Sequence, residues 1–214
     1  AAEDILSDIL RPSLRQEDFD NEKQVILEEI AMYADQPFWQ LYEKTLEIFY
    51  GAHPLSHRVL GTPDSVTRMS RDSMLEYFEN RYSADNTVVA LAGSMDFEDM
   101  VDRIESHCGQ WVTTGAVRSY PDLDHAPTAF TDTCDSINQQ YLCMVAPSPS
   151  MQDDRRYAAG MLAHIFGHHE GSRLYWALVE TGLAEEAQCQ LDARDGTGEY
   201  IAWCCCSPSE AGQC

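Results

Sequence analysis

The sequence predicts an α+β fold, in which helices flank a sheet. Amphipathic helical patterns occupy the first third of the chain, beginning at 1–10 and continuing over 16–33. Further along, helical patterns alternate with short continuous apolar runs, such as "TVVALAG" and "QQYLCMVAP", which are typical of buried strands. The apolar share of 44% is that of a globular protein, so we expect a buried core.

The charge balance narrows the classes of partner. The chain of 214 residues has 14 Lys and Arg against 36 Asp and Glu, a net charge of -22. Each phosphate contact needs a cation, so this balance argues against nucleic acids and anionic membranes as partners. No apolar run approaches the roughly 18 residues of a membrane span. We therefore expect a solvated acidic surface, and no membrane segment in the visible chain.

Helix-start and helix-stop residues set the elements of the first half. Pro12 and Gly51 end helices, Pro37 begins one, and Ser70 and Asp96 are typical N-caps. The predicted helices cover 1–10, 16–33, 37–50, 70–82 and 96–107, with a loop at 51–66 and a buried strand at 87–93.

A shift in composition divides the chain. The stretch 112–128 is rich in turn residues and has no apolar periodicity, so we interpret it as a linker between domains 1–111 and 129–214. After it, the predicted strands are 129–134, 139–146, 186–191 and 199–206, and the predicted helices are 153–166 and 172–181.

Two carboxylates stand out in the helix predicted at 16–33. Glu22 and Glu29 are seven residues apart, about two helical turns, so both lie on one face beside an apolar seam of Val25, Ile26 and Ile30. Carboxylates in such a place are costly to bury unless a cation meets them, and a metal ion is one candidate. A solvated acidic edge of an amphipathic helix is the alternative from spacing alone.

Several segments resemble the insulinase or pitrilysin family of zinc metallopeptidases, the inverted zincins. They are "LSDILRPSLRQEDFDNEKQVILEEI", "YGAHPLSHRVLGTPDSV", "RDSMLEYFENRYSADNTVVALAGSMD" and "GSRLYWALVETGLAEEA". The resemblance implies a helix-flanked, mostly antiparallel sheet of the processing-peptidase-like metallohydrolase type, in two repeats. It also implies Zn²⁺ as cofactor, with Glu29 as a zinc ligand and Glu22 as a carboxylate that orients the site without touching the metal.

The chain departs from that family in two places. The family's H-x-x-E-H motif, which supplies two histidine ligands and the general base, occurs nowhere, and only 28 residues precede Glu29. We therefore expect a fragment, inactive by itself, with 1–111 the C-terminal part of the zinc-binding domain and 129–214 the N-terminal part of its homologous repeat. Val179 and Glu185 stand where the family commonly has a substrate-binding arginine and tyrosine.

The resemblance favours one function and leaves one alternative. The first is a zinc-dependent endopeptidase that hydrolyses peptides or small proteins inside a clam-like chamber, closed by a second half or a partner subunit. The alternative is a non-catalytic homologue that acts as partner subunit or scaffold. The sequence leaves the compartment open between cytoplasm and periplasm.

Two further clusters carry weaker signals. His164, His168 and His169, with Glu170, would satisfy the ligand demand of zinc, but glycines on either side predict a helix end and turn, which favours a structural role. The triplet Cys204–Cys206 cannot easily converge on one metal, because successive residues of a strand point to opposite faces. We interpret the triplet as small apolar filling in a buried strand.

Overall fold

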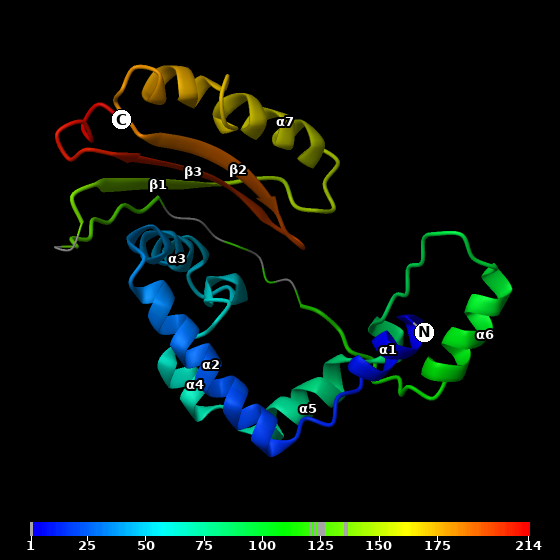
Figure 1. Cartoon of the computed structure of the whole chain (residues 1–214). Helices are drawn as coiled ribbons and strands as arrows, with labels where there is room; N and C mark the ends of the chain where they lie inside the picture. The colour runs from blue at the N-terminus through cyan, green and yellow to red at the C-terminus, as the bar shows by residue number, and fades with distance from the viewer. Residues whose placement is uncertain (1, 120, 122, 124–126, 135–136) are drawn as a thin grey trace. The chain divides into compact units, whose positions relative to one another are not determined.

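The structure is a computed structural model that describes residues 2–119, 121, 123, 127–134 and 137–214 (Figure 1). The chain forms two compact units: Ala1–Glu28 with Thr62–Ser119, and Glu29–Gly61 with Tyr120–Cys214. The long helix α2 (Gln16–Ala34) contributes to both. The predicted domains 1–111 and 129–214 stay a prediction, because spatial grouping does not test homologous repeats.

The first unit is helical, and the starts of α5 (Arg71–Arg81) and α6 (Phe97–Cys108) were predicted by their N-cap residues. Ser70 Oγ caps α5 by accepting from Ser73 N, and Asp96 caps α6 by accepting from Asp99 N at 2.9 Å. The short helix α4 falls in the predicted loop 51–66, which is therefore wrong over its last residues. Besides α2, the elements are α1 (Ala2–Ile9), α4 (Pro63–Arg68), α5 (Arg71–Arg81), η2 (Ala84–Asn86) and α6 (Phe97–Cys108).

Cationic side chains connect the segments of this unit. The Arg11 guanidinium stacks on the Trp111 ring at 4.2 Å and donates to the Tyr82 carbonyl at 2.7 Å. Lys23 Nζ donates to the Thr67 carbonyl at 2.6 Å. Among the described apolar side chains of the unit, Val66 alone is buried. Polar links to the backbone, rather than an apolar core, therefore hold the described part of this unit.

The strand predicted at 87–93 is wrong. The segment has no regular structure, and Val88 and Val89 are 93% and 50% exposed. A strand forms only where a neighbour pairs its backbone amides and carbonyls, and no described strand pairs with this segment. The strand predicted at 129–134 is also wrong, since these residues are exposed and belong to no described strand.

The second unit contains an antiparallel sheet of three described strands. They are β1 (Gln140–Pro147), β2 (Glu186–Ala193) and β3 (Gly198–Cys206), in the order β1-β3-β2. β3 pairs with β1 over 199–206 and with β2 over 198–205, so that Cys204 lies between Leu142 and Ala187. The predicted α+β class with a mostly antiparallel sheet is confirmed.

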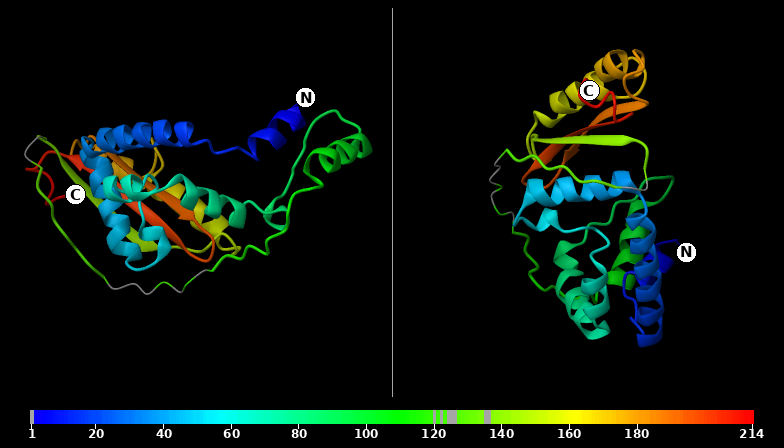
Figure 2. Two further views of the ribbon diagram at one scale, coloured as in Figure 1. Left: turned by 90° about the horizontal axis from the view of Figure 1, so that it is seen from below. Right: turned by 90° about the vertical axis from the view of Figure 1, so that its left-hand side faces the viewer.

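Helices cover both faces of this sheet (Figure 2). α3 (Pro37–Tyr50) lies on one face, where the Phe38 and Trp203 rings are 4.6 Å apart. α7 (Arg156–Gly167) lies on the other. Gly167 allows its close approach, because a Cβ there would come within 2.3 Å of Cys189 N. The short helix η1 (Pro54–Ser56) follows α3.

The helix predicted at 172–181 is present, but its central part is a π-helix and not an α-helix. Its regular part is the π-helix η3 (Tyr175–Val179), preceded by Ser172, whose Oγ accepts from Tyr175 N at 3.2 Å. Gly182, with φ of +77°, ends the segment as predicted. Periodicity alone does not distinguish an α-helix from a π-helix over so few residues.

Successive side chains of β3 point alternately to the two faces of the sheet. Trp203 contacts α3, whereas Cys204 and Cys206 pack with Ala184 and Ala187 against the side chains of η3. All three residues of the cysteine triplet are buried. The prediction that they fill a buried strand is confirmed. In the described residues no helix combines the length and apolar character needed to cross a membrane.

A buried carboxylate joins α3 to the β2–β3 hairpin. Glu199 is fully buried; it accepts a hydrogen bond from the Tyr50 hydroxyl and another from Arg194 Nε at 2.8 Å. Burial raises the pKa of the Glu199 carboxyl, although both hydrogen bonds act in the opposite direction. Burial and the Glu199 hydrogen bond also raise the pKa of Tyr50. The phenol thus stays a neutral donor to this carboxylate.

We predict that Tyr50→Phe lowers the free energy of unfolding of the chain by about 1.5–3 kcal/mol, because a buried charged acceptor loses one donor. Denaturant titration measures this. The matched control is Tyr42→Phe on the same helix, whose hydroxyl has no described hydrogen bond and which should change the value by less than about 0.5 kcal/mol. Equal effects of the two variants would contradict the role given to the Tyr50 hydroxyl.

Candidate functional site

The two carboxylates singled out by the sequence lie on one continuous helix. α2 runs without interruption through Glu22 and Glu29, so their backbones are about 10.5 Å apart along the axis, close to two turns. Acidic residues in its first turn suit the positive end of the helix dipole, and Arg15 binds Asp18 there at 2.7 Å. The helix predicted for these residues is confirmed.

Neither carboxylate is neutralised by a described side chain. Glu22 is exposed and Glu29 is half-buried, and no hydrogen bond or ion pair joins either to another described residue. Lys23, the cation adjacent to Glu22 in sequence, donates to backbone carbonyls instead. The apolar seam beside them is only partly covered, since Val25 is exposed and Ile26 half-buried. Both carboxylates are therefore open to water or to a cation.

The described residues contain no complete metal site. No three His, Cys, Asp or Glu side chains among them gather closely enough to hold an ion. A catalytic zinc takes three protein ligands, so Glu29 would be one member of a larger set. Its half-buried, unpaired carboxylate suits such a role, and the roles predicted for Glu22 and Glu29 stay predictions.

The histidine cluster lies at the end of α7, as predicted. The His164 and His168 rings stack at 3.9 Å, and His169 meets His168 edge-on at 4.5 Å. α7 ends at Gly167, and His169 has a φ of +30° in the turn that follows. The three imidazoles and Glu170 are exposed and do not form a described three-ligand group. The geometry is that of a helix end with stacked rings.

Val179 and Glu185 both contact other residues of the second unit. Val179 is half-buried and packs on the cluster of Ala184 and Cys204. Glu185 is exposed and accepts a hydrogen bond from Gln139 Nε2 at 2.6 Å. Neither is the arginine or tyrosine that the resemblance implies at these places, so these two positions cannot supply a guanidinium or a phenol.

The structure adds a shallow pocket that the sequence did not indicate. It has a volume of about 470 Å³ and lies between the start of α7 and the end of β2. Its cations are already paired, Arg156 with Asp154 at 3.8 Å and Arg194 with Glu199 at 2.8 Å. Sequence patterns carry no signal for it, because its walls meet only through the packing of α7 on β2. The lining residues are Met151, Arg156, Tyr157, Leu191, Asp192, Ala193 and Arg194.

Comparison with known families identifies the chain. The family described as "Peptidase M16 inactive domain" matches residues 68–213, more than half of the sequence. The chain belongs to the M16 peptidase family. This confirms the resemblance to the pitrilysin family of zinc metallopeptidases that the sequence motifs indicated.

Proteins of known sequence and known structure are also similar to this chain. An uncharacterized zinc protease of Mycobacterium leprae (strain TN) is 29% identical over 213 residues, which cover 97% of this chain and 48% of that protein. The crystal structure of a protease from Helicobacter pylori matches with a TM-score of 0.84 at 17% identity, over 99% of this chain and 54% of that one. A chain of complex III2 from Candida albicans matches with a TM-score of 0.81 at 15% identity, over 96% and 52%. The chain thus spans about half the length of the curated relatives it matches.

The stacked histidines allow a test of the geometry at the end of α7. Burial, and then the charges of His164 and His169, lower the pKa of His168. We expect His164→Gln to raise the pKa of His168, because one source of repulsion between imidazolium ions is removed. NMR titration of the imidazole signals measures it, with His57→Gln as the control that leaves the His168 pKa unchanged. An unchanged value in His164→Gln would contradict the stacked arrangement.

Proposed function

We propose that this chain is part of a zinc-dependent M16 endopeptidase that hydrolyses peptides or small proteins. Its membership of the family and the zinc-protease relatives support this. The observation that carries the proposal is α2, a continuous helix that places Glu22 and Glu29 about two turns apart, each without a described side-chain partner. In this proposal the rest of the metal site, including the H-x-x-E-H helix, belongs to the complete protein.

Each carboxylate has a separate role in the proposal. Glu29 would hold zinc through its carboxylate, and Glu22 would orient a histidine ligand through a hydrogen bond. Zinc, when bound, lowers the pKa of a bound water to about 7 and polarises the scissile carbonyl. The described part of the chain contributes the orientation of these carboxylates, because a helix holds their backbones rigidly in register.

We base the proposed chamber on the family and on the lack of an arginine and a tyrosine at positions 179 and 185. Val179 and Glu185 cannot bind the substrate backbone or an oxyanion as an arginine and tyrosine would. In the proposal those groups come from a second half of the protein or from a partner subunit that closes a clam-like chamber. By itself the 214-residue chain would then hydrolyse no peptide.

We predict that Glu29→Gln in the complete protein weakens zinc retention by more than about 100-fold, because losing a ligand should cost more than the 10–100-fold typical of outer partners. Metal analysis after dialysis measures this. Glu28→Gln is the matched control, since Glu28 is an exposed carboxylate on the adjacent position of α2. Zinc content unchanged in Glu29→Gln would remove Glu29 from the metal site.

For Glu22→Gln we predict that zinc stays largely bound while peptide hydrolysis slows by about 10–100-fold. The reason is that the histidine ligand loses the hydrogen bond that orients it. Steady-state kinetics together with metal analysis separate the two effects. Glu17→Gln, an exposed carboxylate in the first turn of α2, serves as the control. Full activity of Glu22→Gln would refute the orienting role.

A second candidate function is supported by different observations. A non-catalytic homologue would act as partner subunit or scaffold, as suggested by the match to an "inactive domain" and by the replacement of the polar pair at Val179 and Glu185. The structural neighbour from complex III2 also shows this fold within a multisubunit assembly. Zinc retained by the complete protein, and lost in Glu29→Gln, would favour the peptidase. A complete protein without zinc affinity would favour the subunit.

A further inference from the structure

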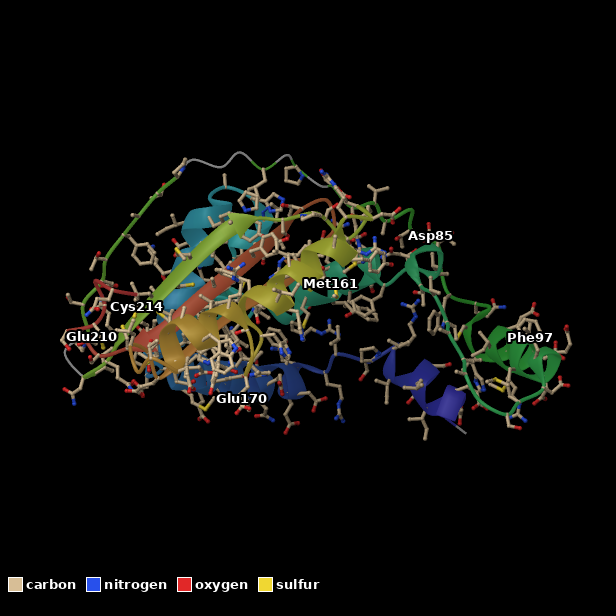
Figure 3. All side chains as sticks on the ribbon, turned by 90° about the horizontal axis from the view of Figure 1, so that it is seen from above. Asp85, Phe97, Met161, Glu170, Glu210 and Cys214 are labelled. Atoms are coloured by element: carbon tan, nitrogen blue, oxygen red, sulfur yellow. The ribbon has the colours of Figure 1, made fainter. Side chains whose placement is uncertain are left out.

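Lys23 is the only cation of α2, and its described hydrogen bonds go to backbone carbonyls of another helix. The helix also carries six Asp and Glu residues. Side chains project from α2 along its whole length (Figure 3), and that of Lys23 reaches the end of α4. There Nζ donates to the Thr67 carbonyl at 2.6 Å and to the Met69 carbonyl at 2.9 Å. A cation suits this place, because the last carbonyls of a helix carry partial negative charge.

A second cation makes the reciprocal contact. Arg71, the first residue of α5, donates from Nε to the Leu14 carbonyl at 2.7 Å and from Nη2 to the Ser13 carbonyl at 3.4 Å. Leu14 lies two positions before α2 and has a φ of +45°, which a leucine adopts only where its surroundings impose it. Each segment thus gives a cation to carbonyls of the other. The first half of α2 is therefore fixed to the junction of α4 and α5.

These contacts fix the rotation of α2 about its own axis. Glu22 precedes Lys23 on the same continuous helix, so the direction of the Glu22 carboxylate changes with that rotation. The side chains of a helix end roughly 5–6 Å from its axis, so a rotation of about 10° moves such an end by about 1 Å. A displacement of about 1 Å in an active site can slow a reaction by about 100-fold. The hold on α2 thus has a consequence for catalysis.

We propose that Lys23 is a positioning residue for peptide hydrolysis, which holds α2 at the rotation in which Glu22 orients the histidine ligand. This inference rests on the proposed function, because it uses the role given there to Glu22. Lys23 touches neither the metal nor the substrate and acts only through Glu22. Arg71 supports the same position by holding the segment that leads into α2.

The test is steady-state kinetics and zinc analysis of the complete protein with Lys23→Met, which removes the donors of the side chain. We expect kcat to fall by about 10-fold, the lower end of the range for Glu22→Gln, with KM and zinc content unchanged. Lys23→Arg should restore most of kcat, because a guanidinium can also donate to two carbonyls. Lys44→Met is the matched control and should leave kcat unchanged. Lys44 is the only other lysine of the sequence and pairs with Glu47 on α3.

A double-mutant cycle separates positioning from a purely structural role. Because Lys23 acts through Glu22, adding Lys23→Met to Glu22→Gln should slow hydrolysis no further. A further loss of about 10-fold in the double variant would overturn the proposal. An unchanged kcat in Lys23→Met, or an equal loss in Lys23→Arg, would also overturn it.

Failure of the proposed function gives a different result. A complete native protein that hydrolyses no peptide refutes the peptidase, and the role of Lys23 in hydrolysis falls with it. Amide hydrogen exchange over 16–28 then decides whether Lys23 holds α2 at all. We expect Lys23→Met to lose protection there, whereas Lys23→Arg and Lys44→Met keep it. Equal protection in Lys23→Met and in the native protein would show that Lys23 does not hold the helix.

Discussion

Backbone pairing along β3 is the constraint on which the second unit depends. Both edges of β3 are filled, by β1 and by β2, so its side chains are held alternately toward α3 and toward α7 and η3. That alternation places Glu199 and Trp203 in one layer and Cys204 and Cys206 in the other. The buried carboxylate of Glu199 then fixes α3 to the hairpin, because a charge so deeply buried requires its donors.

The first unit shows what happens where such pairing is missing. Its apolar segment 87–93 has the composition of a buried strand, yet its valines are exposed because no described strand offers amides and carbonyls to it. The described helices of this unit are instead connected by Arg11, Lys23 and other polar side chains that reach backbone carbonyls.

The carboxylates of the candidate site differ from the buried charge of the core, because they have no described partner. In the core each buried charge meets a partner, whereas Glu22 and Glu29 have none among the described residues. An unpaired, half-buried carboxylate is poorly suited to stability and well suited to an added cation, which is why family membership and local geometry support the same proposal for Glu29.

What the sequence determined by itself is local. Helix ends follow from Pro37, Ser70, Asp96 and similar residues, and the hairpin follows from apolar runs around turn residues, because these signals act within a few residues. The motifs around Glu22 and Glu29 also sufficed to indicate the family. Only the tertiary structure decided that no described strand pairs with 87–93, and that Tyr50 and Arg194 meet Glu199. These contacts join residues distant in sequence or depend on which neighbours are present, and no local pattern encodes either.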